Sequence, residues 1–287
     1  NNPRKRKREG EAMAKIIAVA NQKGGVGKTT TCINLTAALR RMGKRVLLVD
    51  FDPQGNATSG MGVSKHSSPN IYDVLLNGED PRRAVVRLPY GDVLPSNSGL
   101  SGAEVLPVNQ ERREYRLRDV LAPLESAYDY IFLDCPPSLG LLPLNAFTAA
   151  RSILVPLQCE YYAMEGVADL SNTIRLAQKR LNPGLEIEGI LLTMYDSRLT
   201  FSAQVSQELR RYFKGDAQFV GPFLYATAEG TIYGIGLTKG KGNEGEGGGA
   251  GIGAGYSLPL NRKGSLRLEF TADLGFFITR YDPYVYG

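Results

Sequence analysis

The chain has few of the residues that build metal clusters and disulfide frameworks. Its 287 residues include three cysteines, one histidine and no tryptophan. Cys32, Cys135 and Cys159 are widely separated and form no C-x-x-C pair, which argues against a disulfide framework and a zinc site. His66 lies in the polar stretch SKHSSPN and is interpreted as a solvated surface residue. No apolar run reaches the roughly 18 residues of a membrane helix. We therefore expect a protein of a reducing compartment without stable membrane insertion.

The chain has no strong excess of one charge outside its first residues. Its 34 Lys and Arg against 29 Asp and Glu give a net charge of +5. Five consecutive basic residues (4–8) against Glu9 and Glu11 contribute +3 of this (5 − 2), which leaves about +2 for the rest. Such a basic run is typical of a nucleic-acid arm or of a solvated tail, and both interpretations stay open. Because Met13 opens the ordered pattern, residues 1–12 are expected to form a disordered basic tail.

From Met13 to about Val220 the chain alternates short apolar runs with stretches of helical spacing. The pattern predicts strands over 15–20, 45–50, 130–134, 152–157 and 187–193, and helices over 29–42, 112–125, 164–181 and 201–213. Continuous apolar strands that alternate with helices are typical of a parallel sheet covered on both faces. With 43% hydrophobic residues, the chain can bury the core of one or two globular domains.

The pattern changes after about Gly221. A Gly-rich stretch (238–255) precedes strict alternation of apolar and polar residues from Leu266 to Phe276, which predicts one two-faced antiparallel strand. The sequence NRKG (261–264) predicts a hairpin turn just before that strand. The expected domains are therefore the tail 1–12, an α/β domain over 13–220 and an appended Gly-rich β-hairpin segment over 221–287.

The stretch KGGVGKTT (23–30) joins the first predicted strand to the first predicted helix. A Gly-rich loop in that context predicts a P-loop, because glycines let backbone N–H groups approach phosphate oxygens and a helix N-terminus favours an anion. We expect Lys28 at the β- and γ-phosphates, the Thr29 hydroxyl on Mg²⁺ and Thr30 near the α-phosphate. Gln22 replaces the first glycine of the general pattern. The predicted phosphate-binding residues are Gly24, Gly25, Val26, Gly27, Lys28, Thr29 and Thr30.

Carboxylates follow two of the predicted strands. Asp50 ends the second run and Asp52 lies two residues on, while Asp134 ends the third run. Because the carboxyl ends of parallel strands line the crevice where nucleotides bind, these side chains are expected beside the P-loop. Carboxylate oxygens suit Mg²⁺ and can orient a water molecule. Asp50, Asp52 and Asp134 can supply both functions, beside the Thr29 hydroxyl expected on Mg²⁺.

Four stretches together resemble the deviant Walker A ATPases of the ParA/Soj chromosome-partition family: KGGVGKTT, VLLVDFDPQGNATSG, YDYIFLDCPPSLGLL and VPLQCEYYAMEG. They stand in that family's order and spacing, and the resemblance covers about residues 13–213. It implies a doubly wound, mostly parallel α/β sheet of the P-loop NTPase type, with ATP and Mg²⁺ as cofactors and slow ATP hydrolysis. It also implies an ATP-dependent homodimer in the cytoplasm at the nucleoid, which binds DNA non-specifically and is stimulated by a ParB-like protein.

The resemblance also implies roles for single residues. Lys23 matches the family's extra lysine, which reaches the partner subunit's nucleotide, and Gly24 lies at the tight subunit contact. Asp52 matches the residue that positions the attacking water, Asp50 supports the Mg²⁺ shell, and Asp134 is the Walker B carboxylate. The implied catalytic residues are thus Lys23, Lys28 and Asp52. Arg198 in TMYDSRLT matches a DNA-binding position, although a solvated loop arginine explains it equally well.

The resemblance stops after residue 213. The family's last strand, its adenine-enclosing loop and its C-terminal helix are not recognisable there. Residues 221–287 instead weakly resemble part of a small outer-membrane-type β-barrel, which favours a fusion over a docked hairpin sheet. Two alternatives to a working partition switch stay open: a chimeric or truncated nucleotide-binding protein that does not cycle, and a MinD-like membrane-positioning ATPase. The second would need a C-terminal basic amphipathic helix, which the sequence does not show.

Overall fold

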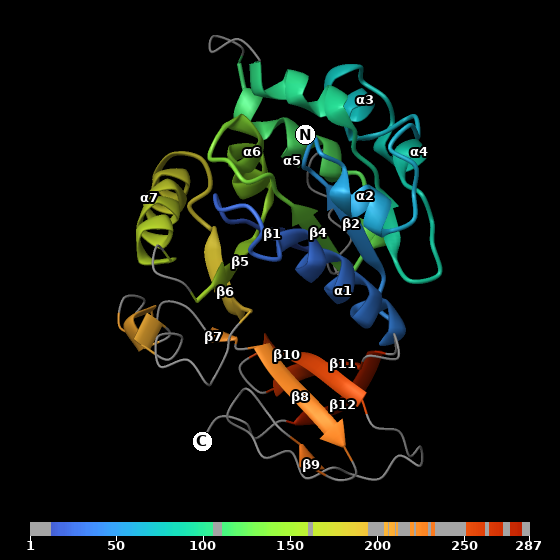
Figure 1. The fold of residues 1–287 in the computed structure, drawn as a ribbon. Helices are drawn as coiled ribbons and strands as arrows, with labels where there is room; N and C mark the ends of the chain where they lie inside the picture. The colour runs from blue at the N-terminus through green and yellow to red at the C-terminus, as the bar shows by residue number, and fades with distance from the viewer. Residues whose placement is uncertain are drawn as a thin grey trace, which may run out of the picture. The chain divides into compact units, whose positions relative to one another are not determined.

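The computed structural model of the chain describes residues 13–105, 111–159 and 163–194, shorter pieces between 204 and 232, and strands between 251 and 282 (Figure 1). Contacts divide the chain into two compact units. The first contains the described parts of 1–22, 28–153 and 172–186, and the second contains those of 23–27, 154–171 and 187–287. The predicted tail (1–12) and Arg198 lie outside the described residues.

The helices and strands, in chain order, are β1 (Lys15–Val19), α1 (Lys28–Arg41), β2 (Val46–Asp50), α2 (Asn56–Gly60), α3 (Ile71–Leu76), α4 (Pro81–Ala84), β3 (Asp92–Leu94), η1 (Ser98–Val105), η2 (Arg113–Tyr115), α5 (Arg116–Leu121), η3 (Glu125–Ala127), β4 (Tyr130–Asp134), α6 (Leu141–Ala149), β5 (Ser152–Gln158), α7 (Ala163–Arg180), β6 (Glu186–Thr193), β7 (Phe219–Val220), β8 (Pro222–Ala228), β9 (Thr231–Ile232), β10 (Gly251–Asn261), β11 (Gly264–Thr271) and β12 (Phe276–Asp282).

The first sheet has the strand order β3-β2-β4-β1-β5-β6-β7. β4 pairs in parallel with β1 on one side and with β2 on the other, and the three strands lie side by side in Figure 1. All five residues of β2 are buried, as are four of the five in β1 and in β4. Burial on both faces explains why these strands read as continuous apolar runs. The predicted parallel α/β sheet is confirmed.

The prediction missed one strand before Asp134, which changes the position of the Asp134 strand in the chain order. β3 has only three residues, which is too short for a periodic signal, and it pairs in parallel with the outer side of β2. Asp134 therefore ends the fourth strand of the chain rather than the third. It still lies at the end of a strand next to β2, because β3 occupies the edge of the sheet.

The two long helices of the first sheet, α1 and α7, agree with the prediction to within one residue at each end. The prediction of a single helix over 112–125 is wrong, because η2, α5 and η3 occupy that stretch. Arg112 has a positive φ of 56°, and Pro123 supplies no N–H to continue α5. None of the helices in the described part of the chain is long and apolar enough to cross a lipid bilayer.

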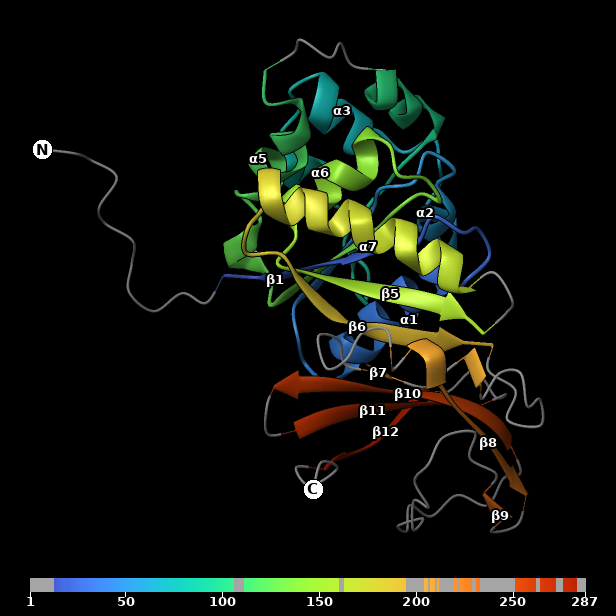
Figure 2. The same ribbon diagram turned by 90° about the vertical axis from the view of Figure 1, so that its left-hand side faces the viewer.

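The second unit contains a five-stranded antiparallel sheet of order β12-β11-β10-β8-β9. Figure 2 shows β10, β11 and β12 running side by side. The predicted turn after β10 is confirmed, since Asn261 pairs with Gly264. The prediction of one strand from Leu266 to Phe276 is wrong: β11 ends at Thr271, and Phe270 pairs with Phe276 on β12. A short strand, β7, also pairs in parallel with β6, although no further strand of the parallel sheet was expected after residue 213.

Candidate nucleotide site

The loop Lys23–Gly27 ends one residue before α1 and has the backbone of a phosphate-binding turn. Gly25 and Gly27 have positive φ values of 74° and 91°, which L residues adopt only with strain. The Thr193 hydroxyl, at the end of β6, donates to the Val26 carbonyl oxygen at 2.9 Å and holds this side of the loop. Lys23 and Gly24 are exposed. The backbone of Gly25 and Gly27 thus requires glycine, whereas the contact from Thr193 carried no local signal in the sequence.

Lys28 is the first residue of α1 and is buried, which is unusual for a lysine. Burial lowers the pKa of Lys28, while the carboxylates of Asp134 and Asp52 act in the opposite direction. The predicted P-loop lysine thus lies in the electrostatic field of two predicted site carboxylates. Thr29, the next residue, is half-buried, and Thr30 is exposed.

Asp50 and Asp134 are directly paired across the neighbouring parallel strands β2 and β4. Burial, followed by the charge of Asp50, raises the pKa of Asp134 to about 7, although Thr29 and Lys28 act in the opposite direction. Neither carboxylate oxygen of Asp134 has a hydrogen-bond partner among the described residues. Burial likewise raises the pKa of Asp50 to about 6, against hydrogen bonds from Thr58. The strand register therefore puts the two carboxylates side by side, and their role at a metal ion stays a prediction.

Asp52 lies just after β2 and is also buried. One of its oxygens accepts a hydrogen bond from the backbone N–H of Gln54 at 2.9 Å, which orients the carboxylate within the turn. Its charge acts on both Lys28 and Asp134. The structure thus brings Lys28, Asp50, Asp52 and Asp134 into one cluster.

The cluster fits a magnesium ion. The described part of the chain contains no group of three or more His, Cys, Asp or Glu side chains able to hold a metal. Mg²⁺ does not need such a cage, because it is commonly held by one or two carboxylates with water and phosphate oxygens. A buried carboxylate without hydrogen bonds is unfavourable unless a cation accompanies it. Asp134 supplies such a carboxylate next to Asp50, and an all-oxygen donor set suits a hard cation.

Two buried cysteines also lie close to Asp134, and the sequence did not indicate the closeness of Cys32. Cys32 is in α1 and Cys135 follows β4. Burial raises the pKa of both thiols far above the usual range, and the charge of Asp134 raises it further. Neutral buried thiols are poor nucleophiles and poor metal ligands. They therefore serve as apolar packing around the carboxylate.

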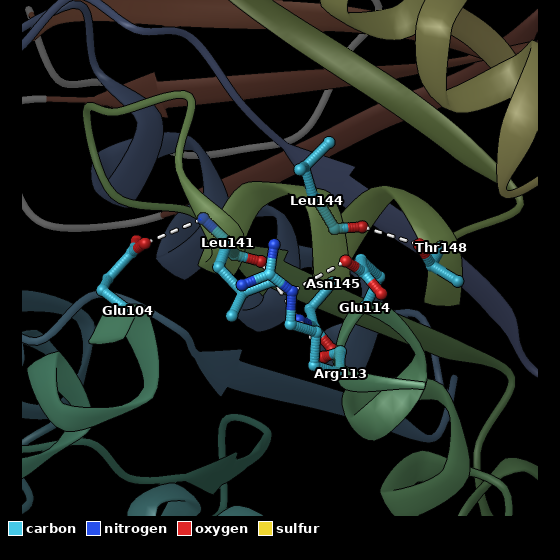
Figure 3. Close-up of polar contacts among 7 residues, drawn as sticks. All are labelled: Glu104, Arg113, Glu114, Leu141, Leu144, Asn145 and Thr148. Atoms are coloured by element: carbon cyan, nitrogen blue, oxygen red, sulfur yellow. Dashed lines mark hydrogen bonds and ion pairs between the residues drawn. The ribbon is translucent and has the colours of Figure 1, made fainter. Parts of the chain in front are cut away.

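The connection from Asp134 to α6 is held by Glu104, a second feature that the sequence did not reveal. Figure 3 shows the Glu104 carboxylate facing the first turn of α6. Its oxygens accept hydrogen bonds from the N–H groups of Leu141 at 2.8 Å and Leu142 at 3.3 Å. Asn145 further ties α6 to the Arg113 carbonyl oxygen at 2.9 Å. The stretch after Asp134 is therefore fixed at its far end by a carboxylate cap.

Comparison with known proteins identifies the family. A family model described as an AAA domain matches residues 14–187. The chain is 55% identical to the chromosome partitioning protein ParA of Myxococcus xanthus over 205 residues, which cover 70% of this chain and 72% of that protein. The chain belongs to the ParA/Soj family of P-loop ATPases.

Another ParA/Soj relative is the sporulation initiation inhibitor protein Soj of Bacillus subtilis, 52% identical over 205 residues, or 70% of this chain and 81% of Soj. A crystal structure of cobyrinic acid a,c-diamide synthase from Mycobacterium smegmatis, with bound ATP analog and magnesium, is 45% identical. It superposes with a TM-score of 0.66 and covers 69% of this chain and 82% of that one. The predicted ParA/Soj fold is thus confirmed.

A second family model, described as a protein of unknown function, matches residues 161–287 and overlaps the AAA match over 161–187. The C-terminal part of the chain therefore resembles a family other than the AAA domain. The resemblance of 221–287 to an outer-membrane protein stays a prediction, as do the individual roles that the ParA/Soj motifs imply.

Proposed function

We propose that this chain binds ATP with Mg²⁺, hydrolyses it slowly and acts as an ATP-dependent dimerising switch in chromosome or plasmid partition. One observation carries the proposal: Asp134 is buried with both oxygens unpartnered among the described residues, and it lies in the fields of Lys28 and Asp50. Such a carboxylate is stable at neutral pH when a cation binds beside it. Bound Mg²⁺ would supply charge neutralisation at the phosphate oxygens.

Each residue of the cluster has a role in this proposal. Lys28 holds the phosphates, and its burial strengthens that attraction because water screens it less. Thr29, Asp50 and Asp134 hold the metal ion. Asp52 orients the attacking water, for which a fixed carboxylate is enough, and the Gln54 N–H fixes it.

The exposed start of the loop supports dimerisation. A Cβ added at Gly24 would meet no atom within 4 Å among the described residues, so the chain itself does not require glycine there. The close approach of a second subunit would require it. Lys23 is exposed beside Gly24, where it would act on a partner's nucleotide in the manner of a trans-acting cation.

The names of the relatives differ in the biological role that they state. The relative named as a chromosome partitioning protein is 55% identical to this chain, whereas the named synthase is 45% identical. We therefore favour partition, with non-specific DNA, a ParB-like protein and a second copy of the chain as partners at the nucleoid. Arg198 is the proposed DNA contact, and binding through phosphates would weaken steeply with added salt.

The match of residues 161–287 to a different family favours a second candidate function. We propose residues 13–220 as the ATPase domain, preceded by a basic tail (1–12) and followed by a separate β-sheet segment (221–287). If that segment replaces elements needed for pairing, the chain would bind nucleotide without cycling.

Phosphate release from ATP tests the proposed activity. Wild-type protein is expected to release phosphate only with Mg²⁺, and Lys28→Ala and Asp134→Asn are expected to be inactive. Arg82→Ala is the matched control, because Arg82 is an exposed residue of α4 outside the cluster. Mg²⁺-independent release, or full activity of Asp134→Asn, would contradict the proposal.

A further inference from the structure

The carboxylate of Asp50 is held from one side by a single residue, Thr58 of α2. The Thr58 backbone N–H donates to Asp50 Oδ2 at 2.7 Å, and the Thr58 hydroxyl donates to the same oxygen at 2.6 Å. Both side chains are fully buried. Oδ2 thus has two short hydrogen bonds, while Oδ1 accepts one long bond of 3.3 Å from the Asp52 N–H.

The direction of the hydroxyl proton is fixed by a third segment. Ser96, two residues after β3, donates its backbone N–H to Thr58 Oγ1 at 2.8 Å. Because that N–H occupies the acceptor side of the hydroxyl, the Thr58 proton is directed to Asp50. The hydroxyl therefore donates to Asp50 Oδ2, which acts as the acceptor.

We propose that Thr58 is a positioning residue of the nucleotide site, which engages Oδ2 of Asp50 so that Oδ1 is kept for the metal ion and its water shell. This inference rests on the proposed function. A carboxylate with one oxygen locked can rotate little about its Cβ–Cγ bond. Partners of this kind orient groups around a metal, and their removal commonly weakens metal binding by about 10- to 100-fold.

The chain supplies a matched set of variants. Thr58→Val keeps the shape of the side chain and removes the hydroxyl, whereas Thr58→Ser keeps the hydroxyl. Thr36→Val is the control for the same chemical change, because Thr36 is equally buried in α1 and its hydroxyl has no hydrogen-bond partner among the described residues.

The experiment measures the affinity of the full chain for a fluorescent ATP analogue, first in EDTA and then at saturating Mg²⁺. The ratio of the two affinities reports how strongly Mg²⁺ supports nucleotide binding. In Thr58→Val we expect this ratio to fall by about 10-fold or more, while the affinity in EDTA stays at the wild-type value. Thr58→Ser and Thr36→Val should resemble wild type. A general loss of structure would instead weaken binding in both conditions.

A wild-type ratio in Thr58→Val, or an equal loss in Thr58→Ser and Thr58→Val, would overturn the role of Thr58. If Thr58→Val does not fold, Thr58→Cys decides the question, because a thiol is a weaker donor of similar size. A reduced ratio in Thr58→Cys supports the proposal and an unchanged one refutes it. A wild-type chain that binds no analogue in either condition would overturn the proposed function itself, and this inference with it.

Discussion

Asp134 is expected to destabilise the nucleotide-free protein at neutral pH, and Asp134→Asn should remove that cost. Burial and the charge of Asp50 raise the pKa of Asp134 from 3.8 to about 7. One pKa unit corresponds to about 1.4 kcal/mol, so the ionised carboxylate disfavours the folded state by about 4 kcal/mol above pH 7. In Asp134→Asn, Lys28 loses a counter-charge, which offsets part of the gain in stability. We therefore expect a net effect of about 2 to 4 kcal/mol.

The sign of the pH dependence follows from proton binding. Between pH 4 and 7 the folded state keeps the proton on Asp134 and the unfolded state loses it, because the folded pKa is about 7 and the ordinary value is 3.8. The penalty is therefore absent below pH 4, grows through this window and is complete above pH 7. Relative to wild type, Asp134→Asn should gain about 2 to 4 kcal/mol between pH 4.5 and pH 8.

Urea unfolding at pH 4.5 and pH 8 measures this difference, and the constant cost of burying an amide cancels between the two pH values. Asp129→Asn is a control without pH dependence in this range: hydrogen bonds from Arg45 lower the pKa of Asp129 below 3.8, so its removal should reduce stability by nearly the same amount at pH 4.5 and pH 8. If wild type and Asp134→Asn keep the same stability difference at both pH values, Asp134 is not a strained buried carboxylate.

Three further outcomes follow from the site. Lys23→Ala should still bind nucleotide yet lose ATP-driven dimerisation or turnover, measured by light scattering and phosphate release. The control is Lys44→Ala, which changes another exposed lysine. Turnover of Lys23→Ala equal to that of this control would refute a trans role. Gly24→Val should keep the wild-type unfolding midpoint and block dimerisation, because the chain leaves open space there; a lowered midpoint would locate the effect within the subunit. Glu104→Ala should cost about 1 to 2 kcal/mol in urea unfolding by uncapping α6, with Glu104→Gln in between; equal stability of all three proteins would exclude the cap.

The sheet and the carboxylate pair could be predicted because each depends on a local signal. Buried parallel strands are continuous apolar runs, and Asp50 and Asp134 follow two such runs directly. The supporting contacts could not be predicted in the same way. The bond from Ser96 to Thr58 joins residues 38 apart, and the bond from Leu141 to Glu104 joins residues 37 apart. Only the folded chain brings such donors and acceptors together.

The C-terminal strands show how a periodic signal can mislead. Apolar and polar residues alternate from Leu266 to Phe276 without interruption, which predicts one strand. The chain nevertheless reverses between Phe270 and Phe276, which are paired on β11 and β12. Asp273 and Gly275 lie within that alternation, and residues of these types favour turns, which argues against one continuous strand. The alternation of apolar and polar residues can therefore continue in the sequence even where a turn separates two strands.

Nucleotide-dependent mass is the most direct test of the switch. Light scattering on the full chain with Mg²⁺ should give a monomer with ADP and twice that mass with ATP. Asp52→Ala should remain dimeric with ATP, because binding persists when the water is no longer oriented. A monomer with ATP and Mg²⁺ in both proteins would contradict the dimerising switch and favour a chain that binds nucleotide without cycling.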